Sequence, residues 1–271
     1  GITFFDTADM YSQGESESLI GKALRGKRDR IVIASKAGYS LPSRRRWAGR
    51  IKPILRPLVR LLKLRRDQLP GGSSGALSQD FSPKYLLSAV EGSLRRLRTD
   101  HLDILQLHSP PLEVVERGDW LSALEELQRT GKVRYFGVAV DSIDAGLAAL
   151  RYPGVSSIQF TLNLLEQGGA TELFPTAQQR GVGGIARECL ANGLLAKPAS
   201  EIDLKGYCSS PAQEEHRARQ LADLRREAEL DGRSVMSRAL EYPVSVPGVS
   251  VSLLGARSIE QLRALLVATG R

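Results

Sequence analysis

The chain alternates between short apolar runs and longer amphipathic segments, and this alternation limits its fold more than any other feature. Each apolar run predicts a strand and is followed by at least one predicted helix, in seven successive strand–helix units. The predicted strands span residues 2–5, 31–34, 102–107, 133–140, 156–160, 182–186 and 251–254. Strands that are apolar on both faces indicate a parallel sheet covered by helices.

The pattern alone predicts the α/β class and leaves open whether the sheet is an open one or a barrel, because a closed barrel needs eight strands. The 271 residues suit one large domain. We therefore expect residues 1–271 to form a single domain. One long insertion, at about 38–80, interrupts it after the predicted strand 31–34.

The insertion carries the basic character of the whole chain. Residues 44–66 contain ten Lys and Arg side chains and no acidic one, whereas the net charge of the chain is +8. Four interpretations stay open for this segment: a helical decoration packed on the fold, a lid that attracts anions, contact with an anionic membrane surface, or nucleic-acid binding. No aromatic residues are interleaved with the bases, which disfavours nucleic acid.

Cysteine and histidine usage indicates neither a disulfide framework nor a metal site. The chain has two cysteines, Cys189 and Cys208, and three scattered histidines. Secreted small domains are denser in cysteine, and zinc sites have characteristic ligand spacings. We therefore expect a cytoplasmic protein without a bound metal.

Four polar residues stand at or just after the ends of predicted strands, namely Asp6, Tyr11, Lys36 and His108. In an α/β barrel, the carboxyl ends of the strands build the active site. A lysine beside a tyrosine lowers the pKa of the phenol, and a histidine can orient a carbonyl oxygen. Each residue taken singly also has a structural explanation, as a turn, packing or solvated residue. Together they indicate proton delivery to a carbonyl that accepts a hydride.

Six segments in order resemble the aldo-keto reductase family. They cover nearly the whole chain apart from residues 38–80, and their order makes the signal specific. The segments are GITFFDTADMY (1–11), ASK (34–36), LDILQLHSP (102–110), GKVRYFGV (131–138), Gln159 with NLL (163–165), and GARS (255–258).

The resemblance implies a (β/α)8 TIM barrel, which we expect to lack its first strand and helix because the chain enters just before the family's second strand. It also implies a nicotinamide cofactor, NADPH/NADP rather than NADH. Tyr11 is then the general acid, Lys36 the group that lowers its pKa, Asp6 the partner of Lys36, and His108 the group that orients the carbonyl.

The resemblance further implies a set of cofactor-binding residues. Gln159 is expected near the nicotinamide carboxamide, and Leu190 and Gly193 in the loop that meets the pyrophosphate through backbone N–H groups. Arg257, in the motif that begins at Gly255, is expected to pair with the adenosine 2′-phosphate, and Gln261 to lie near the adenosine. Arg187 stands where the family often has an aromatic residue that stacks on the nicotinamide, and we expect its guanidinium plane to replace that ring.

Two departures weaken the predicted contacts with the cofactor. Ala139 and Val140 stand where the family commonly has Ser-Asn, which removes side-chain bonds to the carboxamide. Leu265 replaces an Asn often found near the adenine.

The expected function is NADPH-dependent reduction of an aldehyde or ketone to an alcohol, or the reverse oxidation, with a small-molecule carbonyl substrate and no nucleic acid. The alternative is a catalytically weak, cofactor-binding regulatory module. Trp47, Trp120 and Tyr39 are candidates for lining the substrate pocket, although surface packing is the plainer interpretation of each. The sequence does not define the substrate or the oligomeric state.

Overall fold

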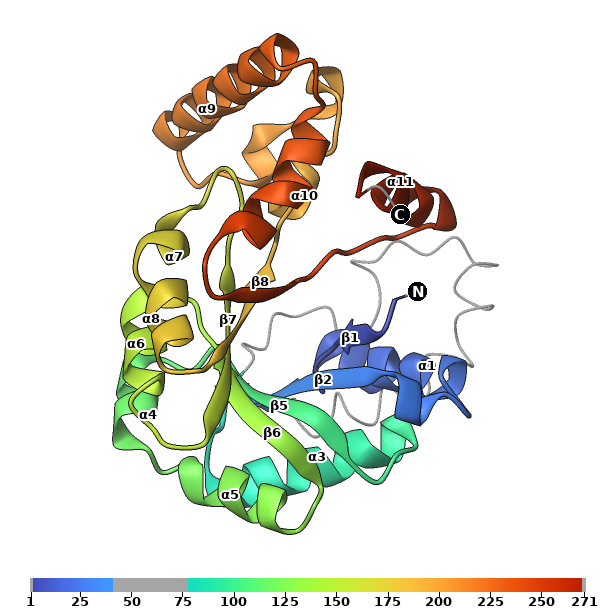
Figure 1. Ribbon diagram of the computed structural model, residues 1–271. Coiled ribbons are helices and arrows are strands. Elements are labelled where there is room, and N and C mark those ends of the chain that lie inside the picture. Colours follow the sequence, from blue (N-terminus) through green and yellow to red (C-terminus); the bar gives the residue numbers. More distant parts are fainter. Residues whose placement is uncertain (1, 41–77, 270–271) are drawn as a thin grey trace, which may run out of the picture. The chain divides into compact units, whose positions relative to one another are not determined.

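The computed structural model describes residues 2–40 and 78–269 of the chain (Figure 1). The chain divides into two compact units, Gly1–Ala139 and Val140–Arg271. Segment 44–66, with all four interpretations proposed for it, lies outside the described residues, as does Trp47.

The first unit is built on four parallel strands in the order β1-β2-β5-β6. Its strands and helices are β1 (Phe4–Asp6), α1 (Glu15–Ala23), β2 (Val32–Ala37), β3 (Tyr39–Ser40), β4 (Ser78–Gln79), α3 (Pro83–Leu97), β5 (Leu102–His108), α4 (Leu112–Arg117), α5 (Leu121–Arg129) and β6 (Val133–Ala139). Helix α3 packs against α1, α5 and β2, and α5 also packs against β6. The predicted alternation of strands and helices is confirmed in this unit.

Helix α3 shows why the sequence folds as it does here. The Ser82 side chain accepts a hydrogen bond from the backbone N–H of Tyr85, and Pro83 occupies the first helical position. A serine cap satisfies an N–H that has no partner within the helix, and proline at that position loses nothing by lacking its own N–H. Ser82 and Pro83 therefore fix the start of this helix.

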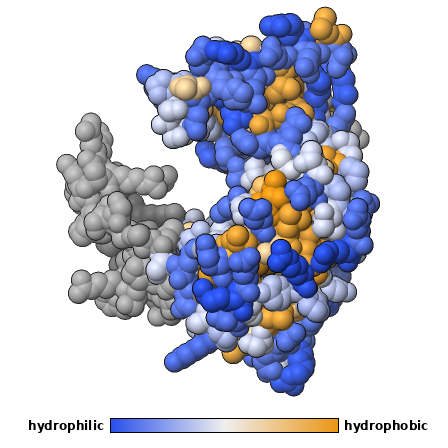
Figure 2. Space-filling view, turned by 90° about the vertical axis from the view of Figure 1, so that its left-hand side faces the viewer, coloured by the Kyte–Doolittle hydropathy of each residue, from blue (hydrophilic) through white to orange (hydrophobic). Residues whose placement is uncertain are grey.

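Figure 2 shows one face of the molecule, on which hydrophobic residues form patches between hydrophilic ones. Within residues 2–40 and 78–269, no helix is long and apolar enough to cross a membrane.

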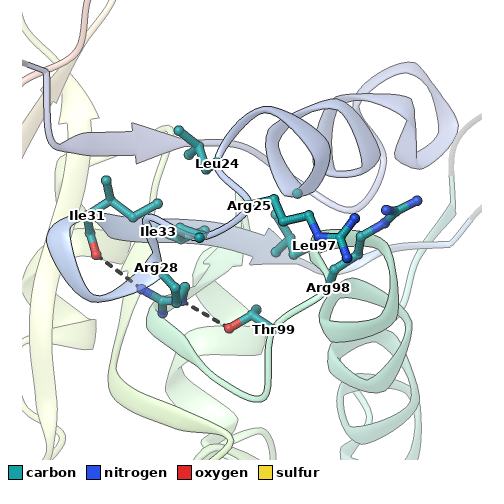
Figure 3. Close-up of a pocket in the computed structure, with 10 residues that line it drawn as sticks. Leu24, Arg25, Arg28, Ile31, Ile33, Leu97, Arg98 and Thr99 are labelled. Atoms are coloured by element: carbon teal, nitrogen blue, oxygen red, sulfur yellow. Dashed lines mark hydrogen bonds between the residues drawn. The ribbon is translucent and has the colours of Figure 1, made fainter.

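A pocket of about 340 Å³ opens at the amino-terminal end of β2, between the carboxyl ends of α1 and α3 (Figure 3). Leu24, Ile33 and Leu97 give it apolar walls, and Arg25 and Arg98 also line it. None of its described lining residues is a predicted site residue. The carboxyl end of β2, where Lys36 stands, is the other end of that strand.

The second unit is built on three parallel strands in the order β7-β8-β9. Its strands and α-helices are α6 (Ile143–Ala149), β7 (Val155–Thr161), α7 (Gly168–Thr171), α8 (Leu173–Gln179), β8 (Gly183–Arg187), α9 (Pro211–Leu230), α10 (Val235–Ser245), β9 (Val249–Ser252) and α11 (Ile259–Ala268). Helices α8 and α10 pack against β8 and β9, respectively. The predicted order of elements is confirmed here too.

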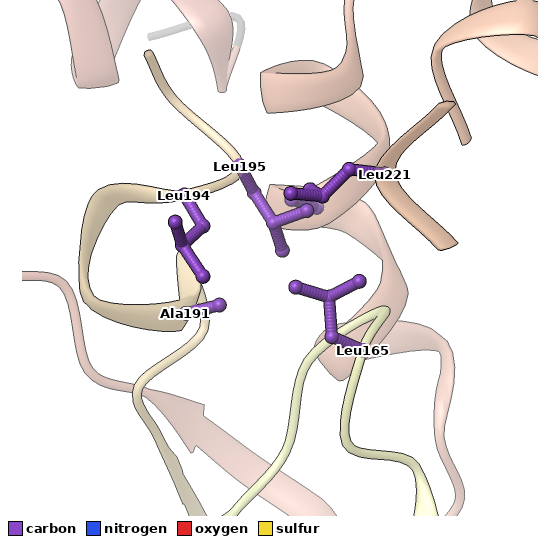
Figure 4. Packing of buried hydrophobic residues seen from close by; sticks show 6 residues of the cluster. Leu165, Ala191, Leu194, Leu195 and Leu221 are labelled. Atoms are coloured by element: carbon purple, nitrogen blue, oxygen red, sulfur yellow. The ribbon is translucent and has the colours of Figure 1, made fainter. Parts of the chain in front are cut away.

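A hydrophobic cluster in the second unit holds the segment that follows β8. Figure 4 shows Leu165, Leu194, Leu195 and Leu221 pointing toward one another. Leu190 is partly buried and packs against this cluster. Burial of apolar side chains stabilises the segment and fixes the backbone that contains Leu190 and Gly193.

Candidate active site

Strand register brings three of the four predicted catalytic residues to one edge of the first unit. Asp6 ends β1, Lys36 stands near the end of β2, and His108 ends β5. The parallel pairing places Asp6 opposite Ala34 and Lys36 opposite Gln106. Parallel strands end at the same edge of a sheet, so their last side chains meet there.

Lys36 is buried and held by oxygen atoms. Its side chain is 1% exposed, and its Nζ forms an ion pair with Asp6 Oδ1. The same Nζ donates a hydrogen bond to the Thr7 carbonyl oxygen at 3.2 Å. A buried ammonium requires such partners, because its desolvation is costly. Asp6 therefore fixes the position of the Lys36 charge.

The Tyr11 ring lies close to both this charge and His108. Lys36 Nζ is 5.4 Å from the centroid of the Tyr11 ring, and the Tyr11 and His108 rings meet edge-on with centroids 5.7 Å apart. Tyr11 is 40% exposed, whereas His108 is 7% exposed. The structure thus brings all four predicted catalytic residues together, and Tyr11 is the one that solvent or a small molecule reaches most easily.

Tyr39 forms a wall beside His108 that the sequence indicated only weakly. Its ring meets the His108 ring edge-on, with centroids 4.9 Å apart. The preceding Gly38 has φ +142°, and a Cβ there would lie 2.3 Å from the Phe81 ring. Only glycine fits such a position, so Gly38 and Phe81 together direct the chain into Tyr39.

The short strands β3 and β4 complete this wall. They pair in antiparallel register, with Tyr39 opposite Gln79 and Ser40 opposite Ser78. The Gln79 side-chain amide donates a 2.7 Å hydrogen bond to the Ser109 carbonyl oxygen. The β3–β4 pair therefore links both ends of the insertion to the strand end that carries His108.

Two further residues connect Tyr39 to the loop after β1. The Tyr85 hydroxyl donates a 2.6 Å hydrogen bond to the Tyr39 carbonyl oxygen and lies 3.5 Å from Asp9 Oδ2. Burial, together with the nearby Glu17 charge, raises the pKa of Asp9 to about 7. Asp9 and Tyr85 are 76 residues apart and were not predicted from the sequence. Only the position of Asp9 between Asp6 and Tyr11 hinted at a role.

An ion pair between a fully buried glutamate and a partly exposed arginine supports β2. Glu17 on α1 is fully buried; its Oε1 accepts a 2.6 Å hydrogen bond from the Ser35 hydroxyl, and its Oε2 pairs with Arg96 Nε at 2.6 Å. Ser35 directly precedes Lys36 in β2. Glu17 therefore ties α1 and α3 to the strand that carries the lysine.

The predicted cofactor residues all lie in the second unit. Gln159 is buried on β7, opposite Ile185 of β8. Arg187 ends β8, and its guanidinium donates to Thr161 Oγ1 at 3.2 Å and to the Val140 carbonyl oxygen at 3.1 Å, and pairs with Asp141. These contacts hold the guanidinium at the carboxyl ends of the strands.

The other predicted cofactor residues occupy a loop and a helix start. The Gly193 N–H donates to the Leu190 carbonyl oxygen at 2.9 Å, so in this structure it is engaged within its own loop. Gly255, Arg257 and Gln261 are exposed, and the Arg257 N–H donates to Gln261 Oε1 at 2.8 Å.

The start of α11 fits a phosphate group. Ser258 caps this helix, whose first residue follows Arg257 by two positions. The amino-terminal end of a helix carries partial positive charge, and a guanidinium adds a full one. Arg257 has no ion-pair partner among the described residues. Leu265 on the same helix is buried, so its side chain serves packing.

One weakly predicted pocket residue is not at the site. Trp120 is fully buried in the first unit, and its indole N–H donates to the Val115 carbonyl oxygen at 3.4 Å. The prediction that it lines the substrate pocket or packs on the surface was wrong. Its ring fills the core next to α5, where an apolar body with one satisfied N–H is stable.

The fold and the site define a class of protein before any comparison is made. Parallel strands with helices between them carry a lysine, a carboxylate, a tyrosine and a histidine at their carboxyl ends. This is the arrangement of an α/β enzyme that transfers protons to or from a bound small molecule.

Comparison with known proteins identifies the family. The aldo/keto reductase family model matches residues 1–269. The uncharacterized oxidoreductase YqkF of Bacillus subtilis is 30% identical over 268 residues, which cover 97% of this chain and 76% of YqkF. The chain therefore belongs to the aldo/keto reductase family.

Solved structures agree with this assignment. The holo form of the aldo-keto reductase AKR11C1 from Bacillus halodurans matches with a TM-score of 0.78 and 30% identity, over 100% of this chain and 78% of that one. An aldo-keto reductase from Klebsiella pneumoniae in complex with NADPH matches with a TM-score of 0.66 and 25% identity, over 100% and 75% of the two chains. The predicted (β/α)8-barrel class is confirmed, and the protein is an NAD(P)H-dependent oxidoreductase of carbonyl compounds.

Proposed function

We propose that the protein reduces an aldehyde or ketone to an alcohol with NADPH, or catalyses the reverse oxidation, and that Tyr11 is the general acid. The observation that carries this proposal is the placement of the Tyr11 ring close to both the Lys36 ammonium, 5.4 Å from its centroid, and the His108 ring, 5.7 Å away. When bound, the cofactor supplies the hydride, and the residues of the chain handle the proton.

Lys36 and Asp6 prepare Tyr11 for this role. A free phenol is a poor acid near neutral pH, with a pKa of about 10. A nearby ammonium stabilises the phenolate, and the Lys36 charge is fixed by Asp6 and the Thr7 carbonyl oxygen. Tyr11 then delivers its proton to the carbonyl oxygen of the substrate as negative charge develops there.

His108 orients the substrate in the proposed reaction. It lies between the rings of Tyr11 and Tyr39, and the Gln79 side chain binds the carbonyl oxygen of the next residue, Ser109. A ring held in this way gives a carbonyl oxygen one direction of approach to Tyr11. Correct orientation lowers the entropic part of the barrier.

We assign the cofactor contacts to the second unit. Gln159 and Arg187 are proposed to meet the nicotinamide, with the guanidinium plane of Arg187 taking the place of an aromatic ring. Leu190 and Gly193 are proposed to meet the pyrophosphate, which requires the Gly193 N–H to leave the Leu190 carbonyl oxygen. Gly255, Arg257 and Gln261 are proposed to hold the phosphorylated adenosine. The NADPH complex of the Klebsiella pneumoniae relative supports the phosphorylated cofactor.

Direct assay tests the proposed function. The purified protein is incubated with NADPH and a panel of aromatic, aliphatic and sugar aldehydes, and loss of reduced nicotinamide is followed. We expect turnover with at least one aldehyde, and the alcohol as the product. Tight NADPH binding without turnover of any carbonyl compound in either direction would favour the regulatory module instead.

Arg257→Ala is expected to weaken NADPH binding selectively. Hydrogen bonds to a charged group contribute about 1.5–3 kcal/mol, so the Kd for NADPH should rise about 10- to 100-fold. The Kd for NADH should stay unchanged, because NADH has no 2′-phosphate. Fluorescence titration measures both. The matched control is Arg263→Ala, which replaces an exposed arginine on α11, the helix that follows Arg257. An equal loss of affinity for both cofactors would refute the assignment.

Three further expectations remain proposals. We propose that residues 1–271 act as one domain, that the protein works in the cytoplasm, and that its substrate is a small carbonyl compound.

A further inference from the structure

The Asp9 carboxyl is a half-buried acid next to the proposed active site that the proposed reaction does not use. Its backbone N–H donates to the Lys36 carbonyl oxygen at 3.0 Å. Its Oδ1 is buried and has no hydrogen-bond partner among the described residues. The pKa of this carboxyl is raised to about 7, first by burial and then by Glu17. Both protonation states are therefore populated near neutral pH.

Tyr85 connects this carboxyl to Tyr39 through a single hydrogen atom. The Tyr85 oxygen is 2.6 Å from the Tyr39 carbonyl oxygen and 3.5 Å from Asp9 Oδ2. A phenol hydroxyl donates one hydrogen bond, whereas a carboxylate only accepts and a protonated carboxyl also donates. The Tyr85 hydroxyl therefore cannot donate a full hydrogen bond to the Tyr39 carbonyl oxygen and to an ionised Asp9 at the same time.

We propose that Asp9 and Tyr85 form a proton-dependent positioning pair for Tyr39 and, through the Tyr39 ring, for His108; this rests on the proposed function of His108. In the protonated state, Asp9 donates to the Tyr85 oxygen and Tyr85 donates to the Tyr39 carbonyl oxygen. In the ionised state, Tyr85 turns its hydrogen toward the Asp9 carboxylate. Tyr39 then loses one of the contacts that hold its backbone beside His108.

The groups around Asp9 determine the direction of this change. Glu17 of α1 faces it with like charge, Arg96 of α3 faces it with opposite charge, and the Met10 N–H and the Tyr85 hydroxyl stabilise the ionised form. Arg96 is already paired with Glu17. Burial and Glu17 therefore outweigh the other groups, and the form that anchors Tyr39 prevails below about pH 7.

The Tyr39 carbonyl reports the proposed exchange directly. Labelling tyrosine with ¹³C at the carbonyl and serine with ¹⁵N selects Tyr–Ser peptides, of which the chain has two, Tyr11–Ser12 and Tyr39–Ser40. Tyr39→Phe assigns the signals by removing one of them. In the cofactor-free protein, we expect the Tyr39 carbonyl shift to titrate with a midpoint near pH 7, as the hydrogen bond from Tyr85 is lost.

Two variants lock the pair in opposite states. Asp9→Asn keeps a donor toward Tyr85 at every pH, so the Tyr39 carbonyl should stay at its low-pH shift. Tyr85→Phe removes the donor, so the carbonyl should stay at its high-pH shift. The exposed Asp144→Asn is the control and should titrate like the wild type. A wild-type shift without a midpoint near pH 7, or an Asp9→Asn shift that still titrates, overturns the proposal.

Folding does not obscure this test. The pKa of Asp9 in the folded chain lies above the usual value of 3.8, so the folded state holds a proton that the unfolded state releases between about pH 4 and pH 7. Stability from this group is lost as pH rises through that window. Asp9→Asn should therefore be at least as stable as the wild type at pH 8, and it decides the question even if Tyr85→Phe fails to fold.

Kinetics separates the positioning pair from the proposed function. In the wild type, we expect the KM for the aldehyde to rise about 2- to 10-fold between pH 6 and pH 8, the effect of losing about one hydrogen bond. Asp9→Asn should keep the low KM throughout. A titrating Tyr39 carbonyl in a protein without turnover would refute the proposed function and leave the pair standing. Turnover with a Tyr39 carbonyl that does not titrate would refute the pair alone.

Discussion

Tyr11→Phe is expected to reduce kcat about 100- to 10,000-fold, the usual contribution of a general acid or base. The phenylalanine ring keeps the shape of Tyr11 and its edge contact with His108, 5.7 Å between centroids, but it carries no proton. NADPH affinity should be unchanged, because the proposed cofactor residues are elsewhere in the chain. Single-turnover reduction of an aldehyde, measured beside NADPH titration, tests both statements.

Tyr135→Phe is the matched control for this prediction. Tyr135 is 57% exposed on β6 and is not part of the site, so the same chemical change there should leave kcat unchanged. A Tyr11→Phe protein that keeps more than about one tenth of the wild-type kcat would show that another group supplies the proton.

Arg96→Met is expected to lower the free energy of unfolding by about 1–3 kcal/mol, the usual cost of leaving a buried polar group without its partner. The partner left behind is Glu17, which is fully buried and, among the described residues, keeps the hydrogen bond from Ser35. The unpaired Glu17 carboxylate contacts Ser35 of β2, which directly precedes Lys36. Denaturant unfolding followed by circular dichroism measures the loss.

The neighbouring Arg95→Met provides the control, because Arg95 is exposed on the same helix and its replacement should change stability little. The double variant Glu17→Gln with Arg96→Met removes both charges and should regain part of the loss. Equal stability of the Arg96→Met and Arg95→Met proteins would mean that the ion pair contributes no net stability.

Much of the fold follows from local sequence signals. The strand and helix order was predictable because buried parallel strands are short apolar runs, and because signals such as Ser82 and Pro83 mark helix starts. The β3–β4 pair was not, since two-residue strands have no periodicity to detect. Helix α4, Leu112–Arg117, was also missed, because six residues give less than two turns of pattern.

The catalytic residues were predictable because they stand at or just after strand ends and match the family's motifs. The register of β1, β2 and β5 brings Asp6, Lys36 and His108 together. Asp9 and Tyr85 were not predictable, because their contact joins a loop to a helix 76 residues away. Trp120 was misjudged, since an aromatic residue at a helix start has the same sequence signature whether it is exposed or buried.

The pairing of β3 with β4 has a consequence for how the length of the insertion can vary. Ser40 and Ser78 lie opposite each other in the β3–β4 pair. The insertion between them therefore leaves and rejoins the fold at this pair. The cost of closing a loop grows only slowly with its length. A change in the length of chain between Ser40 and Ser78 therefore costs little, as long as the β3–β4 pair keeps Tyr39 and Gln79 beside His108. The residues proposed to move the proton can therefore keep their arrangement when the length of this insertion changes.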